Sequence, residues 1–436
     1  MHNPKLALDD CFLHDRDRLR HGEALDLLRA RLIPIADVET VALSTAHGRV
    51  VAKDITAPHP VPLHTNSAVD GYALNHADVD NATGPLPISQ RIAAGMLSPQ
   101  PLARGTAVRI FTGAVMPEGA NTVAMQEDCE TQSTGNQNRP EVRLPTNLKL
   151  GANCRKAGED LALGETVLQA GTVVRASHIA AAASVGTSEL CVFKPLRIAL
   201  FSNGDELRDA EEASPTPLRL GQVFDTNSPM LAGLVRALPV DVVERTIIPD
   251  GLKETESALV KASQTADIII TSGGASRGEE DHMLTALDRL GKRHLWQLAI
   301  KPGRPMIMGQ IARGSSQADC LYFGLPGNPV AAFVCFLLYV RPSLLALAGA
   351  PFAPLPRYTI ESGFEISSKK PDRREFLRAK RVTLPDGRRV VQKFARDGSG
   401  LISSLHQSDG LVEIPEDVTQ IALGDPVTFI PYPDGC

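Results

Sequence analysis

The chain has 436 residues, of which 43% are hydrophobic and 22% are charged, as in ordinary soluble globular proteins. This length predicts two to four units that each bury a core. The net charge of −5 and the 4% aromatic content argue against nucleic acid or an anionic membrane as a partner. The seven cysteines include no CxxC pair and the chain opens without a signal-peptide pattern, so we expect a cytoplasmic protein.

The N-terminal part reads as two units. Leu25, Leu28 and Leu32 have helical spacing and precede Pro34, which predicts a helix over 21–33. Pro-rich loops and short alternating runs predict a small β-rich domain over 59–150. Turn-rich sequence and an Ala-rich helix over 177–185 follow. We expect 1–58 and 151–192 to form one discontinuous N-terminal domain.

Residues 193–350 alternate short β-branched runs with helical patterns. This alternation predicts an α/β domain with a parallel-rich sheet, whose ligands would lie at the carboxyl ends of the strands. The apolar run 330–340 is too short to span a bilayer and predicts a buried helix. Strands are expected at 197–201, 240–248, 266–270, 305–308 and 320–323, and helices at 253–264, 282–290 and 329–347.

The remaining residues, 355–436, predict a C-terminal β domain. The runs 378–383 and 388–393 are joined through Pro-Asp-Gly, which is typical of a hairpin.

Two glycine-rich segments follow predicted strands and open predicted helices. Thr271–Asp281 combines glycines and hydroxyls, so loop N–H groups and a helix N-terminus would converge on a phosphate or an oxyanion. Gly324–Pro329 offers a similar preorganised helix start, with Asn328 as cap and Pro329 in the first turn. A well-capped helix without a ligand is the alternative explanation of the second segment.

Acidic and basic groups accompany these loops. Carboxylates at predicted strand ends suit a Mg²⁺ site, although each also reads as a cap or turn residue. Lys301 and Arg304, in a Pro- and Gly-shaped turn, and the basic run that includes Arg378 suit a phosphate or tetrahedral oxyanion. A solvated hairpin face explains the latter run about as well. The acidic candidates are Asp70, Asp160, Glu206, Asp250 and Asp281.

Several common catalytic motifs are missing from the sequence. It contains no GxxxxGK[ST], GxGxxG or HExxH pattern. Composition and spacing therefore predict a multidomain α/β-plus-β protein that binds a phosphorylated or oxyanionic small ligand together with Mg²⁺.

An ordered set of motifs resembles the MoeA family, the molybdopterin molybdenumtransferases related to the gephyrin E domain. The resemblance implies an elongated four-domain homodimer whose central domain is like the molybdopterin-binding domain of the adenylyltransferase one step earlier. It also implies that molybdate is inserted into adenylylated molybdopterin with Mg²⁺, releasing AMP and molybdenum cofactor, with transient contacts to that adenylyltransferase and to apo-molybdoenzymes. The motifs are Asn66–Ala73, Gly158–Asp160, Gly204–Leu207, Asp225–Asn227, Ser272–Gly278 with Asp281, Lys301–Pro305 and Gly324–Val330.

The resemblance also implies residue roles. Asp250 and Asp281 would bind the metal at the pterin-phosphate end of the cleft, with Glu206 beside them. Three residues of the smaller domains, Asp70, Thr112 and Asp160, would reach the cleft from the other subunit. Molybdate would be received by Ser276, Lys301, Arg378 and Ser399, with Arg304 in place of a frequent Lys. Further substrate contacts are expected from Ser272, Gly273, Gly274, Pro326, Gly327 and Asn328.

Two positions depart from the family pattern, and two other functions compete. Gln297 stands where some members carry Lys, and Arg277 stands where a small apolar residue is usual; both affect the expected molybdate pocket. The α/β domain alone also resembles a molybdopterin adenylyltransferase. A non-catalytic scaffold like the gephyrin E domain is the second alternative.

Overall fold

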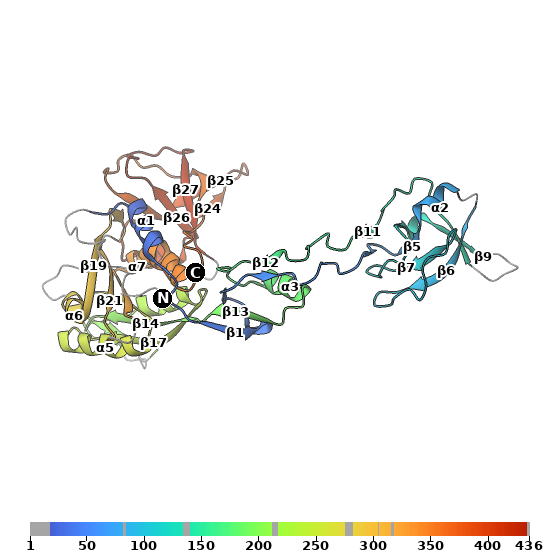
Figure 1. Ribbon diagram of the computed structural model, residues 1–436. Coiled ribbons are helices and arrows are strands. Elements are labelled where there is room, and N and C mark those ends of the chain that lie inside the picture. The colour runs from blue at the N-terminus through green and yellow to red at the C-terminus, as the bar shows by residue number, and fades with distance from the viewer. Residues whose placement is uncertain are drawn as a thin grey trace.

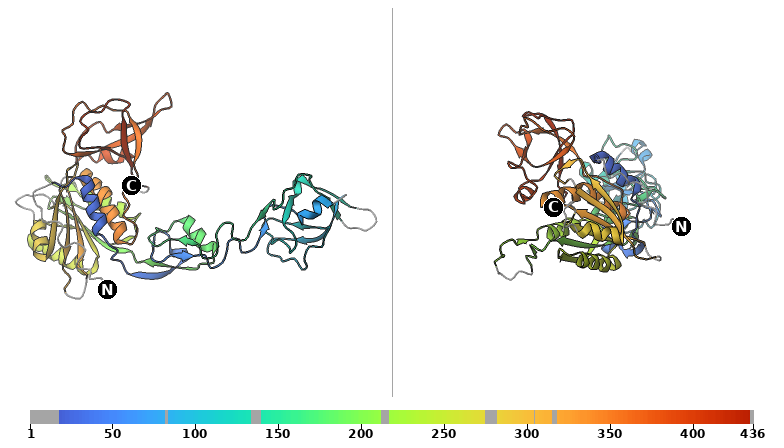
Figure 2. Two further views of the ribbon diagram at one scale, coloured as in Figure 1. Left: turned by 45° about the horizontal axis from the view of Figure 1, so that its top comes forward. Right: turned by 90° about the vertical axis from the view of Figure 1, so that its left-hand side faces the viewer.

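The computed structural model describes residues 18–81, 84–133, 140–211, 217–274, 282–303, 305–314 and 318–433. The molecule is elongated, with an α/β domain and a C-terminal β domain together at one end (Figure 1). A small mixed unit comes next, and a distal β-rich domain stands at the far end of a narrow connection (Figure 2). The expected multidomain α/β-plus-β architecture is therefore confirmed.

A sheet of six strands, counted over the described residues, forms the centre of the α/β domain in the order β17, β14, β18, β22, β21, β19. The first four strands are parallel, whereas β21 is antiparallel to β22 and the edge strand β19 is antiparallel to β21. The parallel-rich sheet is confirmed, and the edge strand β19 is an addition to it. The bounds are β14 (Leu196–Asn203), β17 (Val240–Ile248), β18 (Ile268–Ser272), β19 (Gly291–Gln297), β21 (Pro305–Ile311) and β22 (Cys320–Leu325).

Helices cover both faces of this sheet. Neighbouring residues of a strand point to opposite faces, so Ile268 joins the core under α4 (Asn227–Val235) and Ile269 joins the core under α5 (Leu252–Thr265) and α6 (His282–Leu290). The predicted bounds of the helix over 282–290 are confirmed.

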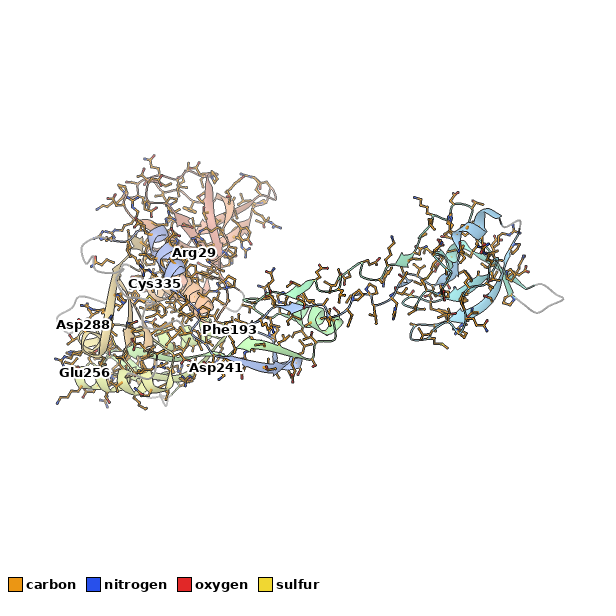
Figure 3. All side chains as sticks on the ribbon, viewed as in Figure 1. Arg29, Phe193, Asp241, Glu256, Asp288 and Cys335 are labelled. Atoms are coloured by element: carbon orange, nitrogen blue, oxygen red, sulfur yellow. The ribbon has the colours of Figure 1, made fainter. Side chains whose placement is uncertain are left out.

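One long helical stretch lies in the interior. It consists of α7 (Pro329–Cys335), the π-helical η4 (Phe336–Val340) and α8 (Arg341–Leu347). Cys335 lies within it, deep in the body of the molecule (Figure 3). Among the described helices this stretch is the one long and apolar enough to cross a membrane, but 94% of its most apolar window is buried. The predicted buried helix is thus confirmed.

Helix α1 (His21–Arg31) packs against the α/β domain. Its residues Ala24, Leu25 and Leu28 share a core with α8, although the sequence led us to expect this helix in the discontinuous unit. The following strands do meet the later segment, because β1 and β2 both pair with β13 and β3 pairs with β12. The mixed unit contains β1 (Val38–Ala42), η2 (Leu43–Thr45), β2 (Val50–Val51), β3 (Ile55–Thr56), β12 (Thr166–Leu168), α3 (Ala176–Ser184) and β13 (Glu189–Phe193).

The distal domain contains a sheet in the order β8, β5, β7, β6, β10, β9. Two extended segments connect it to the mixed unit, and they are joined by the short pair β4 (Asn66–Ser67) and β11 (Cys154–Arg155). Its elements are β5 (Gly71–Leu74), α2 (His76–Asn81), β6 (Leu86–Ile92), β7 (Ala107–Ile110), β8 (Thr122–Met125), η3 (Gln126–Asp128), β9 (Glu130–Ser133) and β10 (Pro140–Arg143).

The C-terminal domain closes into a barrel-like sheet in the order β20, β24, β25, β23, β27, β26, because the last strand, β26, also pairs with β24. The predicted hairpin is confirmed as β24 and β25. Strand β20 (Ile300–Lys301), which leaves the α/β domain, adds to this sheet beside β24 and so joins the two domains. The remaining bounds are β23 (Tyr358–Ser362), β24 (Arg374–Thr383), β25 (Arg389–Lys393), α9 (Ser403–His406), β26 (Gly410–Ile414) and β27 (Pro426–Pro431).

Candidate functional site

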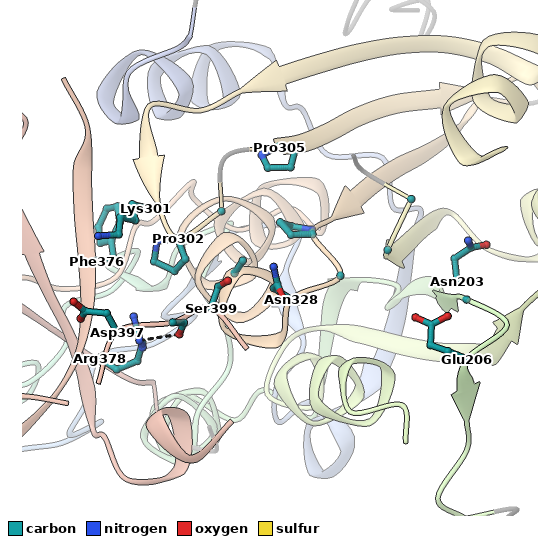
Figure 4. Close-up of a pocket in the computed structure, with 18 of the residues that line it drawn as sticks. Asn203, Glu206, Lys301, Pro302, Pro305, Asn328, Phe376, Arg378, Asp397 and Ser399 are labelled. Atoms are coloured by element: carbon teal, nitrogen blue, oxygen red, sulfur yellow. Dashed lines mark hydrogen bonds between the residues drawn. The ribbon is translucent and has the colours of Figure 1, made fainter. Parts of the chain in front are cut away.

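A cavity of about 710 Å³ lies where the C-terminal domain meets the carboxyl ends of the central strands. One wall comes from the loops after β14, β17, β18 and β22, and the opposite wall comes from β24 and the loop before α9 (Figure 4). A crevice at this end of a parallel sheet is the usual place for a ligand. The described lining residues are Asn203, Gly204, Glu206, Asp250, Gly273, Gly274, Lys301, Pro302, Gly303, Pro305, Pro326, Gly327, Asn328, Ala331, Phe376, Leu377, Arg378, Asp397, Gly398 and Ser399.

The α/β wall brings backbone close to the cavity. Gly273 has φ +94°, and a Cβ there would lie 2.9 Å from the carbonyl oxygen of Asn203, so this position requires glycine. Its N–H donates to Leu325 O across 3.1 Å, which ties the loop after β18 to the end of β22. This wall can therefore approach an anionic group closely with backbone rather than with side chains.

Carboxylates stand at the edge of the same wall. The Asp250 carboxylate accepts hydrogen bonds from Asn203 Nδ2 (2.5 Å) and from the backbone N–H of Asp205 (3.2 Å), and Glu206 lines the cavity nearby. Oxygen donors of this kind fit Mg²⁺, which usually completes its shell with waters and phosphate oxygens. No group of three or more potential metal ligands gathers among the described residues.

The C-terminal wall presents a buried cation. Arg378 on β24 is only 5% exposed, and its guanidinium donates to Ser404 Oγ and to Gly398 O, both at 3.1 Å. Burial lowers its pKa. Within the part of the chain that the structure describes, Arg378 forms no ion pair with a carboxylate, so much of its charge is available to an anion in the cavity.

Ser399 is held next to this cation. Its carbonyl accepts the N–H of Val330 across 3.1 Å, which fixes the loop before α9 against the start of α7. The C-terminal wall is therefore anchored to the helix that follows the glycine-rich loop of the opposite wall.

Lys301 lies between this cavity and a second one of about 790 Å³. Its ammonium is 3.3 Å from Glu375, and its side chain is half exposed. Part of its charge is thus neutralised, unlike that of Arg378. Sequence reasoning missed Glu375 and also Asp397, because neither belongs to a recognisable motif.

The structure brings ten predicted site residues together around the cavity and places Ser272 just behind them, buried against Pro326. The predicted residues Ser276, Asp281 and Arg304, and the departure at Arg277, lie outside the described residues. Gln297 ends β19 and is not among the described lining residues. The ten are Glu206, Asp250, Gly273, Gly274, Lys301, Pro326, Gly327, Asn328, Arg378 and Ser399.

Three predicted residues lie far from the cavity of their own chain. Asp70 and Thr112 are in the distal domain, and Asp160 is on the connection that leads to it (Figure 1). Asp70 Oδ1 accepts hydrogen bonds from the backbone N–H (2.8 Å) and the hydroxyl (2.7 Å) of Thr112, which lower the pKa of Asp70.

Comparison with known proteins covers most of the chain. Family models match the MoeA N-terminal region (domains I and II) at 19–186, a probable molybdopterin-binding domain at 199–346 and the MoeA C-terminal region (domain IV) at 365–432. A molybdopterin molybdenumtransferase of Haemophilus influenzae is 32% identical, with 90% of this chain and 94% of that protein covered. Molybdopterin molybdenumtransferase 2 of Mycobacterium tuberculosis is 35% identical, with 88% and 93% covered.

A solved structure agrees with the fold. The molybdopterin biosynthesis MoeA protein of Pyrococcus horikoshii superposes with a TM-score of 0.77 at 28% identity, and the match covers 95% of this chain and all of that one.

Proposed function

The chain belongs to the MoeA family, and on that premise we propose that the cavity between its two domains inserts molybdate into adenylylated molybdopterin and releases AMP. Its activity is that of a molybdopterin molybdenumtransferase, an enzyme of molybdenum cofactor biosynthesis. The observation that carries the assignment of substrates is the contrast between the two walls. Backbone and carboxylates form one, and in the other stands the buried Arg378, which has no carboxylate partner among the described residues.

The α/β wall would hold the pterin phosphate. In the loops at Gly273–Gly274 and Pro326–Asn328, the N–H groups of Gly274, Gly327 and Asn328 can approach a phosphate and bind it without a mobile side chain. The N–H of Gly273 already donates to Leu325 O, and proline has no N–H. Asp250, with Glu206 beside it and Asp281 of the same motif set, would hold Mg²⁺. When bound, Mg²⁺ neutralises charge on the phosphoanhydride that is cleaved.

The C-terminal wall would receive molybdate. Molybdate is a tetrahedral oxyanion, and the planar guanidinium of Arg378 can donate two parallel hydrogen bonds to two of its oxygens. Ser399 adds a hydroxyl, and Lys301 adds a second positive charge at the mouth. These residues would orient the oxyanion against the pterin.

A second copy of the chain would complete the site. Because Asp70 and Thr112 stand in the distal domain, they can serve a cavity only if it belongs to another subunit. We therefore propose a homodimer, working in the cytoplasm, that takes its substrate in transient contact with the adenylyltransferase and passes its product to apo-molybdoenzymes.

The two competing functions account for less of the molecule. An adenylyltransferase would need only the α/β domain, yet the C-terminal domain supplies six of the twenty described lining residues, including Arg378. A scaffold would need neither the buried Arg378 nor a glycine at position 273, where the backbone leaves no room for a Cβ.

The activity is tested by incubating the purified protein with adenylylated molybdopterin, molybdate and Mg²⁺. We expect AMP and active cofactor to appear together and only with the metal, with the cofactor measured by reconstitution of an apo-molybdoenzyme. AMP without active cofactor would contradict the molybdate assignment. Consumption of ATP would indicate the adenylyltransferase, and neither product would indicate a scaffold.

The dimer is tested by co-expressing two variants that carry different affinity tags. Asp70→Ala damages the distal domain and Arg378→Ala damages the cavity, so each homodimer should be inactive. In each mixed dimer the subunit with the intact cavity faces the intact distal domain of its partner, so one of the two sites is active. Because about half of the randomly paired dimers are mixed, roughly a quarter of all sites should be active. No recovery in the doubly purified mixed dimer would show that Asp70 does not act across the dimer.

A further inference from the structure

A buried polar motif lies behind the α/β wall and has no role in the function proposed above. Asp225 and Asn227, at the start of α4, are only 6% and 8% exposed. Neither lines the cavity in the described part of the chain, but their hydrogen-bond partners belong to the strand ends that do.

Asp225 fixes the motif in place. Its Oδ1 accepts hydrogen bonds from Ser202 Oγ (2.9 Å) and from the backbone N–H groups of Asn227 (2.9 Å) and Ser228 (3.2 Å). Its Oδ2 accepts one from Ser228 Oγ at 2.5 Å. A buried carboxylate with four donors holds the start of α4 rigidly against the end of β14.

Asn227 extends from this anchor to two further strand ends. Its Nδ2 donates to Ser272 Oγ (2.6 Å) at the end of β18 and to Gly327 O (2.7 Å) in the loop after β22. Ser272 Oγ in turn donates to Pro326 O across 3.3 Å. Because the carbonyl of Gly327 can only accept, the amide nitrogen must face it, and both of its N–H groups are used.

The other half of this amide is left without a partner. Asn227 Oδ1 is buried and has no hydrogen bond among the described residues, which costs free energy. A side chain kept in the interior with an unsatisfied acceptor is present for its donors. Those two donors span the gap between the loop of Gly273–Gly274 and the loop of Pro326–Asn328.

We propose that Asn227 is a positioning residue that sets the spacing of these two loops, so that their N–H groups converge on the phosphate of the pterin substrate. The inference rests on the proposed function and assigns a role to the Asp225–Asn227 motif. Among the described residues the side-chain hydrogen bonds of Asn227 go to Ser272 and Gly327, which both belong to the α/β wall. Its loss should weaken pterin binding and leave molybdate binding unchanged.

The test compares Asn227→Ala and Asn227→Leu with the unaltered enzyme. Leucine keeps the volume and branching of the side chain but removes both donors, so it separates hydrogen bonding from packing. Ser343→Ala is the matched control, because this fully buried hydroxyl also donates to a backbone carbonyl (Tyr339 O, 2.6 Å) but lies in α8. The Michaelis constants for adenylylated molybdopterin and for molybdate are measured separately, together with thermal unfolding.

We expect the Michaelis constant for the pterin to rise roughly tenfold in both Asn227 variants, with the constant for molybdate within about twofold of normal. A parallel rise in both constants, or a lower unfolding temperature with both constants unchanged, would overturn the inference. Equilibrium binding of molybdopterin itself, measured without molybdate, gives the same decision without turnover. An enzyme that binds molybdopterin but releases no AMP would contradict the proposed function. The role of Asn227 would still be decided by comparing the dissociation constant for molybdopterin in the Asn227 variants with that in the unaltered enzyme.

Discussion

The two walls of the cavity differ in how they are built. The α/β wall uses glycine backbone and small polar groups, held from behind by buried hydrogen bonds. The C-terminal wall uses long side chains, above all the buried Arg378. The first wall therefore depends on the spacing of several strand ends, whereas the second depends on one charge, and substitutions should affect them differently.

The walls are kept in register by a polar network at the domain junction. His21 Nδ1 is 2.8 Å from the Tyr339 hydroxyl, and its Nε2 accepts a hydrogen bond from Arg357 at 3.1 Å. Glu413 accepts from Arg357 (2.7 Å) and from Arg374 (2.6 Å). Arg374 begins β24, the strand that carries Arg378. This network and the β20–β24 pairing fix the charged wall opposite the backbone wall.

The largest effect should come from removing the centre of this network. Glu413 is 4% exposed and pairs with two arginines, so Glu413→Ala leaves two partly buried charges without their shared partner. We expect the free energy of unfolding to fall by about 3 kcal/mol, measured by denaturant titration. Glu361→Ala is the control, because Glu361 forms an exposed pair with Arg388. Equal changes in the two variants would show that the junction does not depend on this network.

Next in size is the loss of the buried cation. Arg378→Ala should raise the Michaelis constant for molybdate about a hundredfold and leave that for the pterin nearly unchanged, since only the charged wall is altered. Arg381→Ala, on the same strand but exposed and paired with Asp409, should change neither constant. If Arg378→Ala raised the Michaelis constant for the pterin more than that for molybdate, the assignment of the two walls would be reversed.

A smaller effect is expected at Lys301. Its side chain is half exposed and its ammonium is already paired with Glu375. Lys301→Ala should therefore raise the Michaelis constant for molybdate about tenfold, and the Michaelis constant for the pterin should rise less. The exposed Lys380 on β24 supplies a matched control. Equal losses for both substrates would argue that Lys301 holds the phosphate and that the walls share it.

The smallest effect concerns acidity at the junction. Burial lowers the pKa of His21 from 6.5 to about 4, so the unfolded chain binds its proton first as the pH falls. The stability that neutral His21 contributes is therefore fully present above about pH 6.5 and is lost as the pH falls towards 4. When the pH is lowered from 7 to 5.5, the free energy of unfolding of the unaltered protein should fall by about 1 kcal/mol more than that of His21→Gln, as measured by denaturant titration. If the free energy of unfolding depended on pH in the same way in both proteins, this prediction would be wrong. His59→Gln serves as the control.

The sequence predicted the α/β wall well because its signals are local. Strand, glycine loop and helix follow one another within a few residues, and the helix over 282–290 matches its prediction. Strand β19 was not predicted, because its sequence GKRHLWQ lacks the apolar run of the buried strands. The packing of α1 was also missed, since an apolar stripe does not identify the surface that it covers.

The charged wall was harder to predict for a physical reason. The basic run around Arg378 looks the same whether it is solvated or buried, and only the fold shows that Arg378 is buried while Arg381 is exposed. Asp397 lines the cavity and Glu375 pairs with Lys301 at its edge, and both come from a segment far along the chain. Contacts of this kind arise from docking between domains, which residue spacing does not encode.

The shared core at the junction bears on how the protein is made. Phe376, Leu411 and Ile430 of the C-terminal domain belong to the same apolar cluster as α7 and α8. During synthesis the long apolar helix leaves the ribosome before these residues do, so a nascent α/β domain exposes part of that helix until the C-terminal strands arrive. A chain truncated before Arg378 would then be an aggregation hazard as well as an enzyme without its cationic wall.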